Sequence, residues 1–142
     1  MGGYLNERLF LTPTRTDVLQ PIGNNEMSNH NKINYIEIPS KDIRISKTFF
    51  SEVFGWAFID YGPDYCSFGN QGMDGGFYKS DLTVSTDSGS ALIVLYSRDL
   101  EKTQSKIEKS GGKIKKPIFP FPGGRRFHFT DPNGNEYAVW SE

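Results

Sequence analysis

Two side chains of the sequence, His128 and Glu37, suit proton transfer near neutral pH. A histidine side chain has a reference pKa of about 6.5, so His128 could act as a general base. Glu37 could be its carboxylate partner, or it could pair with Arg126. The structural alternatives are a strand histidine that hydrogen-bonds a neighbour and a carboxylate in a solvated salt bridge. Proton transfer therefore requires a fold that brings these distant residues together.

Short predicted elements carry these residues. Residues 33–39 alternate apolar and polar side chains, as a strand does, and place Tyr35 and Glu37 on one face. Residues 42–54 have apolar side chains at helical spacing, and Gly55 fits the position after the helix end. We expect further strands at 56–61, 65–68 and 76–79 and, after a polar loop at 80–90, a strand at 91–96, a helix at 99–110 and strands at 113–119, 125–130 and 136–140.

The order of elements is strand, helix and three strands, and this order occurs twice. The two modules would span about 33–79 and 90–141. They predict an α+β fold in which two βαβββ modules form a curved mixed sheet. Both helices would cover one face of that sheet, and the other face would be an open cleft. Function is then expected on the cleft side.

Strand alternation predicts which side chains lie in the cleft. Glu136 and Trp140 share a face with Ala138 in the last strand, because successive side chains point to opposite faces. Arg126 and His128 share the cleft side of the preceding strand. The expected ligand contacts are the aromatic residues Tyr35, Phe77 and Trp140 and the charged residues Arg126 and Glu136.

The sequence PGGRR at 122–126 has two interpretations. Glycine amides and guanidinium groups can hold a carboxylate or a phosphate. A hairpin connection with exposed arginines is the simpler alternative, because no helix start or P-loop spacing accompanies the glycines.

Composition argues against several classes of function. Sixteen Lys and Arg against seventeen Asp and Glu give a formal charge of −1, so no basic surface favours nucleic acid. No segment has the apolar length of a membrane span, and the single cysteine cannot form an internal disulfide, so the cytoplasm is the expected location. Residues 1–26 are expected to be an N-terminal arm or a cloning-derived leader, and residues 27–142 the domain.

Four segments follow one another in a distinctive order: YIEIPSKDIRISKTFFSEVFGW, GGFY, SRDLEKTQSKIEKSGGKI and PGGRRFHFTDPNGNEYAVW. In this order and spacing they resemble the vicinal oxygen chelate superfamily, which includes glyoxalase I, bleomycin resistance proteins and extradiol dioxygenases. The resemblance covers most of residues 33–140 and implies a homodimer with a divalent metal in the cleft, held by His, Glu or Gln side chains. It specifies no single reaction, because the superfamily includes lyases, oxygenases, epimerases and drug-binding proteins.

The residues at the implied metal positions lack the expected donors. The first-strand position falls on Tyr35, the fifth-strand position on or near Leu92, the last-strand position on Ala138, and the fourth position near Phe77. Leucine and alanine have no donor atom, and a neutral tyrosine is a poor ligand. We therefore expect no metal at the positions that the family uses, and a divalent metal would need ligands from other side chains.

These observations predict a glyoxalase/bleomycin resistance/dioxygenase-like protein that binds a small organic molecule in the cleft without the usual metal centre. One alternative is a lyase, isomerase or dioxygenase-type enzyme that uses substituted metal ligands or acid–base chemistry by His128 and Glu37. Another alternative is a regulatory or interaction module that acts through a dimer surface or the N-terminal arm.

Overall fold

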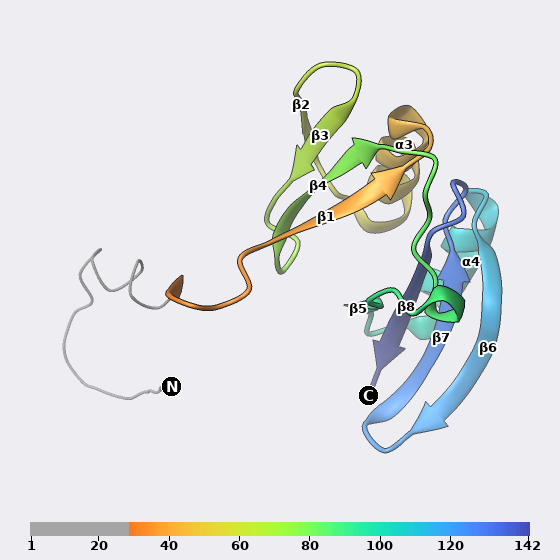
Figure 1. Ribbon diagram of the computed structural model, residues 1–142. Helices are drawn as coiled ribbons and strands as arrows, with labels where there is room; N and C mark the ends of the chain where they lie inside the picture. Colours follow the sequence, from red (N-terminus) through yellow and green to blue (C-terminus); the bar gives the residue numbers. More distant parts are fainter. Residues whose placement is uncertain (1–28) are drawn as a thin grey trace. The chain divides into compact units, whose positions relative to one another are not determined.

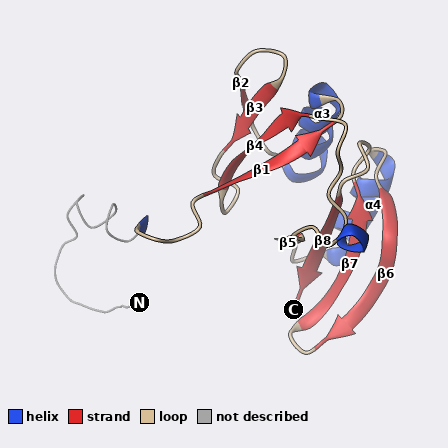
Figure 2. Ribbon diagram, in the orientation of Figure 1, coloured by secondary structure: helices blue, strands red, loops and turns tan. Residues whose placement is uncertain are grey.

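A computed structural model describes residues 29–142, and Tyr35–Glu142 forms one compact unit. The predicted arm at residues 1–26 lies outside the described residues. No helix among residues 29–142 is long and apolar enough to cross a membrane. Figures 1 and 2 show the elements in chain order: β1 (Tyr35–Ser40), α3 (Ile43–Phe54), β2 (Phe58–Asp60), β3 (Tyr65–Phe68), β4 (Asp74–Lys79), a 3-10 turn η2 (Thr86–Ser88), β5 (Ile93–Tyr96), α4 (Leu100–Lys109), β6 (Lys113–Phe121), β7 (Gly124–Thr130) and β8 (Glu136–Ser141).

The strands form two four-stranded sheets. Sheet A has the order β1-β4-β3-β2, and sheet B has the equivalent order β5-β8-β7-β6. In each sheet the first strand of the module is parallel to the last, and the other pairs are antiparallel. The prediction of an α+β fold made of two βαβββ modules is confirmed. The one curved sheet of the prediction is instead two mixed sheets.

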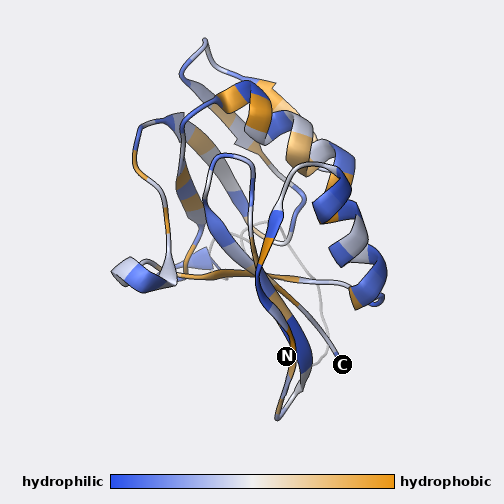
Figure 3. Cartoon of the chain, turned by 90° about the vertical axis from the view of Figure 1, so that its right-hand side faces the viewer, coloured by the Kyte–Doolittle hydropathy of each residue, from blue (hydrophilic) through white to orange (hydrophobic). Residues whose placement is uncertain are grey.

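Helix α3 begins and ends at residues that suit its termini. The carboxylate of Asp42 accepts a hydrogen bond from the backbone N–H of Arg44 (3.0 Å). Gly55 ends the helix with a φ of 73°, which glycine adopts without strain. Both helices carry hydrophobic and hydrophilic residues in alternating stretches (Figure 3). α3 buries five residues, whereas α4 buries only Leu100 and Ile107, so α3 contributes more to the core.

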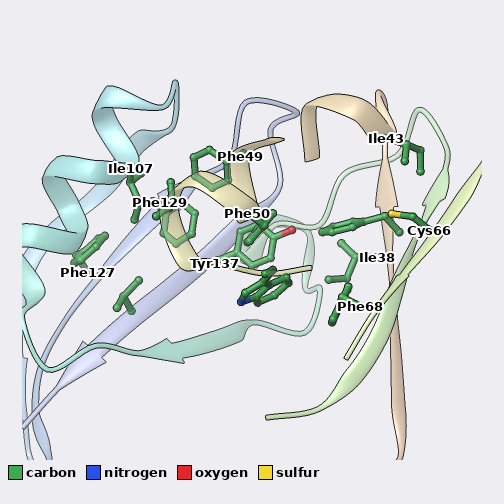
Figure 4. Close-up of a cluster of buried hydrophobic side chains, with 14 of the residues drawn as sticks. Ile38, Ile43, Phe49, Phe50, Cys66, Phe68, Ile107, Phe127, Phe129 and Tyr137 are labelled. Carbon is green, nitrogen blue, oxygen red and sulfur yellow. The ribbon is translucent and has the colours of Figure 1, made fainter. Parts of the chain in front are cut away.

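Phe50 of α3 packs against both sheets. Its ring centroid lies 5.5 Å from that of Phe77 in sheet A and 5.1 Å from that of Tyr137 in sheet B. Figure 4 shows Phe50 beside Tyr137, with Phe129 close to Phe49. Both modules therefore share one aromatic core. We call the sheet faces that contribute to this core the helix-covered faces, and the opposite faces the open faces.

Phe77 lies on the helix-covered face of sheet A, so the prediction that it lines the cleft is wrong. Its side chain is 0% exposed. The register of β1 and β4 pairs Phe77 with Ile38, so the two share a face. Glu37, on the other face of β1, is paired with Gly76. The open face of β4 therefore has a glycine where an aromatic wall was expected.

A turn at 131–135 connects β7 to β8 and joins the second module to the first. The side-chain amide of Asn133 donates a hydrogen bond to the hydroxyl of Ser46 (3.0 Å). The side-chain amide of Asn135 donates to the backbone carbonyl of Pro39 (2.6 Å). Both asparagines are buried. The turn thus satisfies polar groups of the first module that water does not reach.

Asp131 is a buried carboxylate in this turn. It accepts hydrogen bonds from the backbone N–H groups of Asn133 (3.0 Å) and Asn135 (2.9 Å) and from the hydroxyl of Tyr137 (3.3 Å). Burial outweighs these hydrogen bonds and raises the pKa of Asp131 to about 6. Between about pH 4 and pH 6 the folded protein therefore binds a proton that the unfolded chain releases.

Asp131→Asn is expected to change how stability depends on pH. Because the folded pKa of Asp131 lies above its unfolded pKa, the wild type loses up to about 3 kcal/mol as the pH rises from about 4 to about 7. Asparagine keeps the acceptor oxygen and does not ionise. The variant should therefore gain stability relative to wild type between these two pH values. Urea unfolding of both proteins at each pH measures the change. A difference in stability between variant and wild type that is equal at the two pH values would contradict the raised pKa of Asp131.

Candidate functional site

The open face of sheet B presents its side chains in rows across the strands. Residues paired across neighbouring strands lie on the same face, so the registers define these rows directly. One row contains His128, Ala138 and Val94. The adjacent row crosses all four strands and contains Phe119 of β6, Arg126 of β7, Trp140 of β8 and Tyr96 of β5.

His128 is held between a cation and a carboxylate. Its Nδ1 lies 2.8 Å from Oε2 of Glu136, and its Nε2 lies 3.1 Å from Nη2 of Arg126. A guanidinium group can only donate, so Nε2 accepts and the imidazole proton is on Nδ1. His128 is therefore neutral in this arrangement, with its side chain 2% exposed. It can accept a proton at Nε2 only after the bond to Arg126 is broken.

Glu136 is the carboxylate partner of His128, and its side chain is 1% exposed. It also accepts hydrogen bonds from Nζ of Lys115 (2.8 Å) and from the backbone N–H (2.7 Å) and hydroxyl (2.9 Å) of Thr86. Burial alone would raise the pKa of Glu136, but the hydrogen bonds from His128, Lys115 and Thr86 outweigh it and hold the pKa below its ordinary value. The carboxylate is therefore ionised at neutral pH.

Glu37 lies on the open face of sheet A. Its carboxylate accepts a hydrogen bond from the hydroxyl of Tyr65 (3.0 Å), which is also 2.7 Å from the hydroxyl of Tyr35. Burial, followed by these two contacts, raises the pKa of Tyr65 above its ordinary value. The predicted partnership of Glu37 with His128 or Arg126 is not formed among residues 29–142, where the carboxylate of Glu37 bonds Tyr65 and the ring of His128 bonds Glu136 and Arg126. The structure brings Glu136 to His128 instead.

The register of the last hairpin was the signal that could have identified Glu136 as the partner. β7 and β8 pair Thr130 with Glu136 and His128 with Ala138, so Glu136 is the diagonal neighbour of His128 on one face. Strand alternation places Glu136 on this face, where it is predicted only as a ligand contact. Thr86 and Lys115 are not predicted, because no local pattern relates the polar loop or the sixth strand to the start of β8.

The residues at the implied metal positions do not fit a metal centre. Ala138 is buried and has no donor atom, and Leu92, which precedes β5, has none either. Tyr35 lies in the other sheet, where its hydroxyl is hydrogen-bonded to Tyr65. Among residues 29–142, no three His, Cys, Asp or Glu side chains gather in an arrangement that could hold a metal ion. The donor set that the resemblance implies is thus absent from these positions.

The two arginines of the PGGRR segment have different environments. Arg125 forms a two-bond ion pair with Glu101, with N–O distances of 2.7 and 3.3 Å. Arg126 lies on the open face, where its guanidinium carbon is 5.4 Å from the ring centroid of Phe119 and 5.9 Å from that of Phe121. Arg125 therefore agrees with the interpretation of the segment as a hairpin connection, whereas Arg126 lies beside aromatic rings on the open face.

Comparisons with known proteins agree with the fold. Residues 32–139 match the sequence profile of the Glyoxalase/Bleomycin resistance protein/Dioxygenase superfamily. No curated protein matches the chain significantly. A glyoxalase-related enzyme from Fulvimarina pelagi is 17% identical, with a TM-score of 0.66, over 79% of this chain and 88% of that one.

Two further solved structures are similar at the level of the fold. Lactoylglutathione lyase from Agrobacterium tumefaciens is 15% identical, with a TM-score of 0.60, over 78% of this chain and 93% of that one. A mutant of the fosfomycin resistance protein FosX from Listeria monocytogenes, complexed with Mn(II) and 1S,2S-dihydroxypropylphosphonic acid, is 17% identical, with a TM-score of 0.65, over 78% and 90% of the two chains. At these identities the likeness concerns the fold alone.

Proposed function

Because the chain belongs to the glyoxalase/bleomycin resistance protein/dioxygenase superfamily, we propose that it binds a small organic molecule on the open face of sheet B without the usual metal centre. The pairing of His128 with Ala138 carries the proposal. It puts a residue without a donor atom at an implied metal position, beside a hydrogen-bonded histidine. The adjacent row offers Arg126 and Trp140, which remain our predicted ligand contacts.

The chemistry of this face supports a binding site for an organic ligand. Trp140 is half-buried and lies 5.1 Å from Tyr96 and 6.2 Å from Phe121, measured between ring centroids. Partly exposed aromatic rings can contact a planar or amphiphilic molecule over a large area. The FosX mutant is a relative that holds a small organic molecule on this fold, together with Mn(II).

We also propose that the protein is a homodimer, as the family resemblance implies, and that it is cytoplasmic, as its composition predicts. Large apolar side chains are exposed on the side of sheet A that no helix of the described residues covers. Ile59 and Tyr61 are both 62% exposed, and Tyr35 is 42% exposed. A second protomer could bury this surface. Sedimentation equilibrium that gives the mass of one chain at all concentrations would contradict the dimer.

Metal-independent binding predicts that a ligand stabilises the protein in the presence of a chelator. The experiment is a thermal-shift assay of small aromatic and amphiphilic compounds in EDTA. A compound at one hundred times its Kd adds about 2.7 kcal/mol, which raises the Tm by several degrees. Trp140→Ala should lose the shift, whereas Ile45→Ala on the exposed side of α3 should keep it. A shift that occurs only after Mn²⁺ or Zn²⁺ is added would contradict the proposal.

The buried His128–Glu136 pair supports a second candidate function, an isomerase or lyase that moves a proton. In this function a substrate displaces Arg126 from Nε2 of His128, which then accepts the proton while Glu136 stabilises the imidazolium. Compounds that bind in the thermal-shift assay provide the substrates to test. Conversion by the wild type that is unchanged in His128→Gln would exclude this function.

A further inference from the structure

Arg126 is a cation that no carboxylate contacts directly among residues 29–142, whereas the adjacent Arg125 is paired with Glu101. The Nε–H of Arg126 is buried and has no hydrogen-bond partner in the same part of the chain. A buried donor without a partner costs free energy, so a group that accepts from this guanidinium would be stabilised there.

The surrounding polar network does not supply that group. His128 bonds Arg126 through Nε2 as a neutral acceptor. The nearest ionised carboxylate of the network, Glu136, already accepts from His128, Lys115 and Thr86. The charge of Lys115 is shared between Glu136 and Asp87. Lys115 and its two carboxylates carry a net charge of −1, but neither carboxylate contacts Arg126 directly. Among residues 29–142, the one hydrogen-bond partner of the Arg126 guanidinium is the neutral His128.

Aromatic rings flank the guanidinium on the open face. Phe119 and Trp140 are its cross-strand partners, and Phe121 lies within 5.9 Å of its carbon. The ring faces of Phe119 and Phe121 attract the cation, which stabilises it without accepting its N–H groups. They also leave apolar surface beside a cation. An organic anion with an aromatic body would contact both features at once.

We propose that the ligand of this face is an organic carboxylate with an aromatic or amphiphilic body, and that Arg126 recognises the carboxylate. The inference rests on the proposed function and names its ligand class. A guanidinium presents parallel N–H groups that match the two oxygens of a carboxylate. Trp140, Phe119 and Phe121 then contact the body of the ligand.

The test compares two probes of equal shape, 2-naphthoate and 2-naphthamide, by NMR titration of the indole N–H of Trp140 in the full-length protein. We expect naphthoate to bind at least about 10-fold more tightly than naphthamide, because a hydrogen bond to a charged partner is worth about 10- to 100-fold in affinity. Arg126→Gln should abolish this preference. Arg126→Lys should keep part of it, because lysine keeps the charge without the planar fork.

Arg125→Gln is the matched control, because its side chain is paired with Glu101 outside the row of aromatic residues. It should leave the preference for naphthoate unchanged, and the amide spectrum of each variant shows whether it is folded. Equal binding of both probes, or a preference that persists in Arg126→Gln, would overturn the inference while leaving small-molecule binding intact. No perturbation of Trp140 by either probe at millimolar concentration would overturn the proposed site itself.

Discussion

Glu136→Ala is expected to lower the free energy of unfolding by about 3–5 kcal/mol, the cost of removing one partner from a buried charged pair. The substitution leaves Nδ1–H of His128, the ammonium group of Lys115 and the backbone N–H of Thr86 without their shared acceptor. All three groups surround a site that is nearly closed to water. Urea unfolding at pH 7, followed by tryptophan fluorescence, measures the loss.

Two matched variants separate the charge of Glu136 from its shape. Glu136→Gln keeps an acceptor for Thr86 but removes the charge, so its destabilisation should be intermediate. Glu101→Ala removes an exposed carboxylate whose partner is Arg125, and its effect should be much smaller. If Glu136→Ala were no more destabilising than Glu101→Ala, the buried network would have no net role in stability.

The stability that the ionised side chain of Glu136 contributes should depend on pH in a defined direction. The pKa of Glu136 in the folded protein is below its unfolded value, so its ionisation contributes stability above the unfolded pKa. This contribution is lost as the pH falls toward the folded pKa. The difference between wild type and Glu136→Gln should therefore shrink in acid. Asp131 behaves in the opposite sense, because burial raises its pKa.

Local sequence signals predicted most of the secondary structure. The predicted strand at 65–68 coincides with β3 (Tyr65–Phe68), because turn residues precede and follow it. The predicted helix at 42–54 differs from α3 (Ile43–Phe54) by one residue, because Asp42 is its N-cap. The repeated order of elements predicted the two modules. Each of these features depends on residues that are close in sequence.

Features that depend on the register between distant strands could not be predicted from local sequence signals. Alternation placed Phe77 correctly within a strand, but only its pairing with Ile38 assigns it to the helix-covered face. Glu37 and His128 were related through an assumed continuous sheet, whereas they lie in two sheets and bond different partners. Thr86, which donates hydrogen bonds to Glu136 from fifty residues away, begins the 3-10 turn η2 in a polar segment whose sequence has no periodic pattern. Alternation therefore predicted which residues of β7 and β8 share a face, but not the hydrogen bonds that they form.

Asn135→Ala is expected to destabilise the protein by about 3 kcal/mol, because one buried and one partly buried backbone group lose their partners at once. The side-chain amide of Asn135 donates to the carbonyl of Pro39 (2.6 Å), and its oxygen accepts from the backbone N–H of Val84 (2.9 Å). One side chain thus connects the start of β8 to the first module and to the intervening loop. Alanine fills neither role.

Asn135→Asp distinguishes the donor of this side chain from its acceptor. Aspartate can still accept from Val84, but it places a second oxygen against the carbonyl of Pro39, where a donor is required. Its loss of stability should therefore equal or exceed that of alanine, whereas alanine at the exposed Asn34 should have little effect. Urea unfolding of the three variants provides the comparison. If Asn135→Asp were as stable as wild type, the hydrogen bond from the side-chain amide of Asn135 to the carbonyl of Pro39 would not stabilise the contact between the two modules.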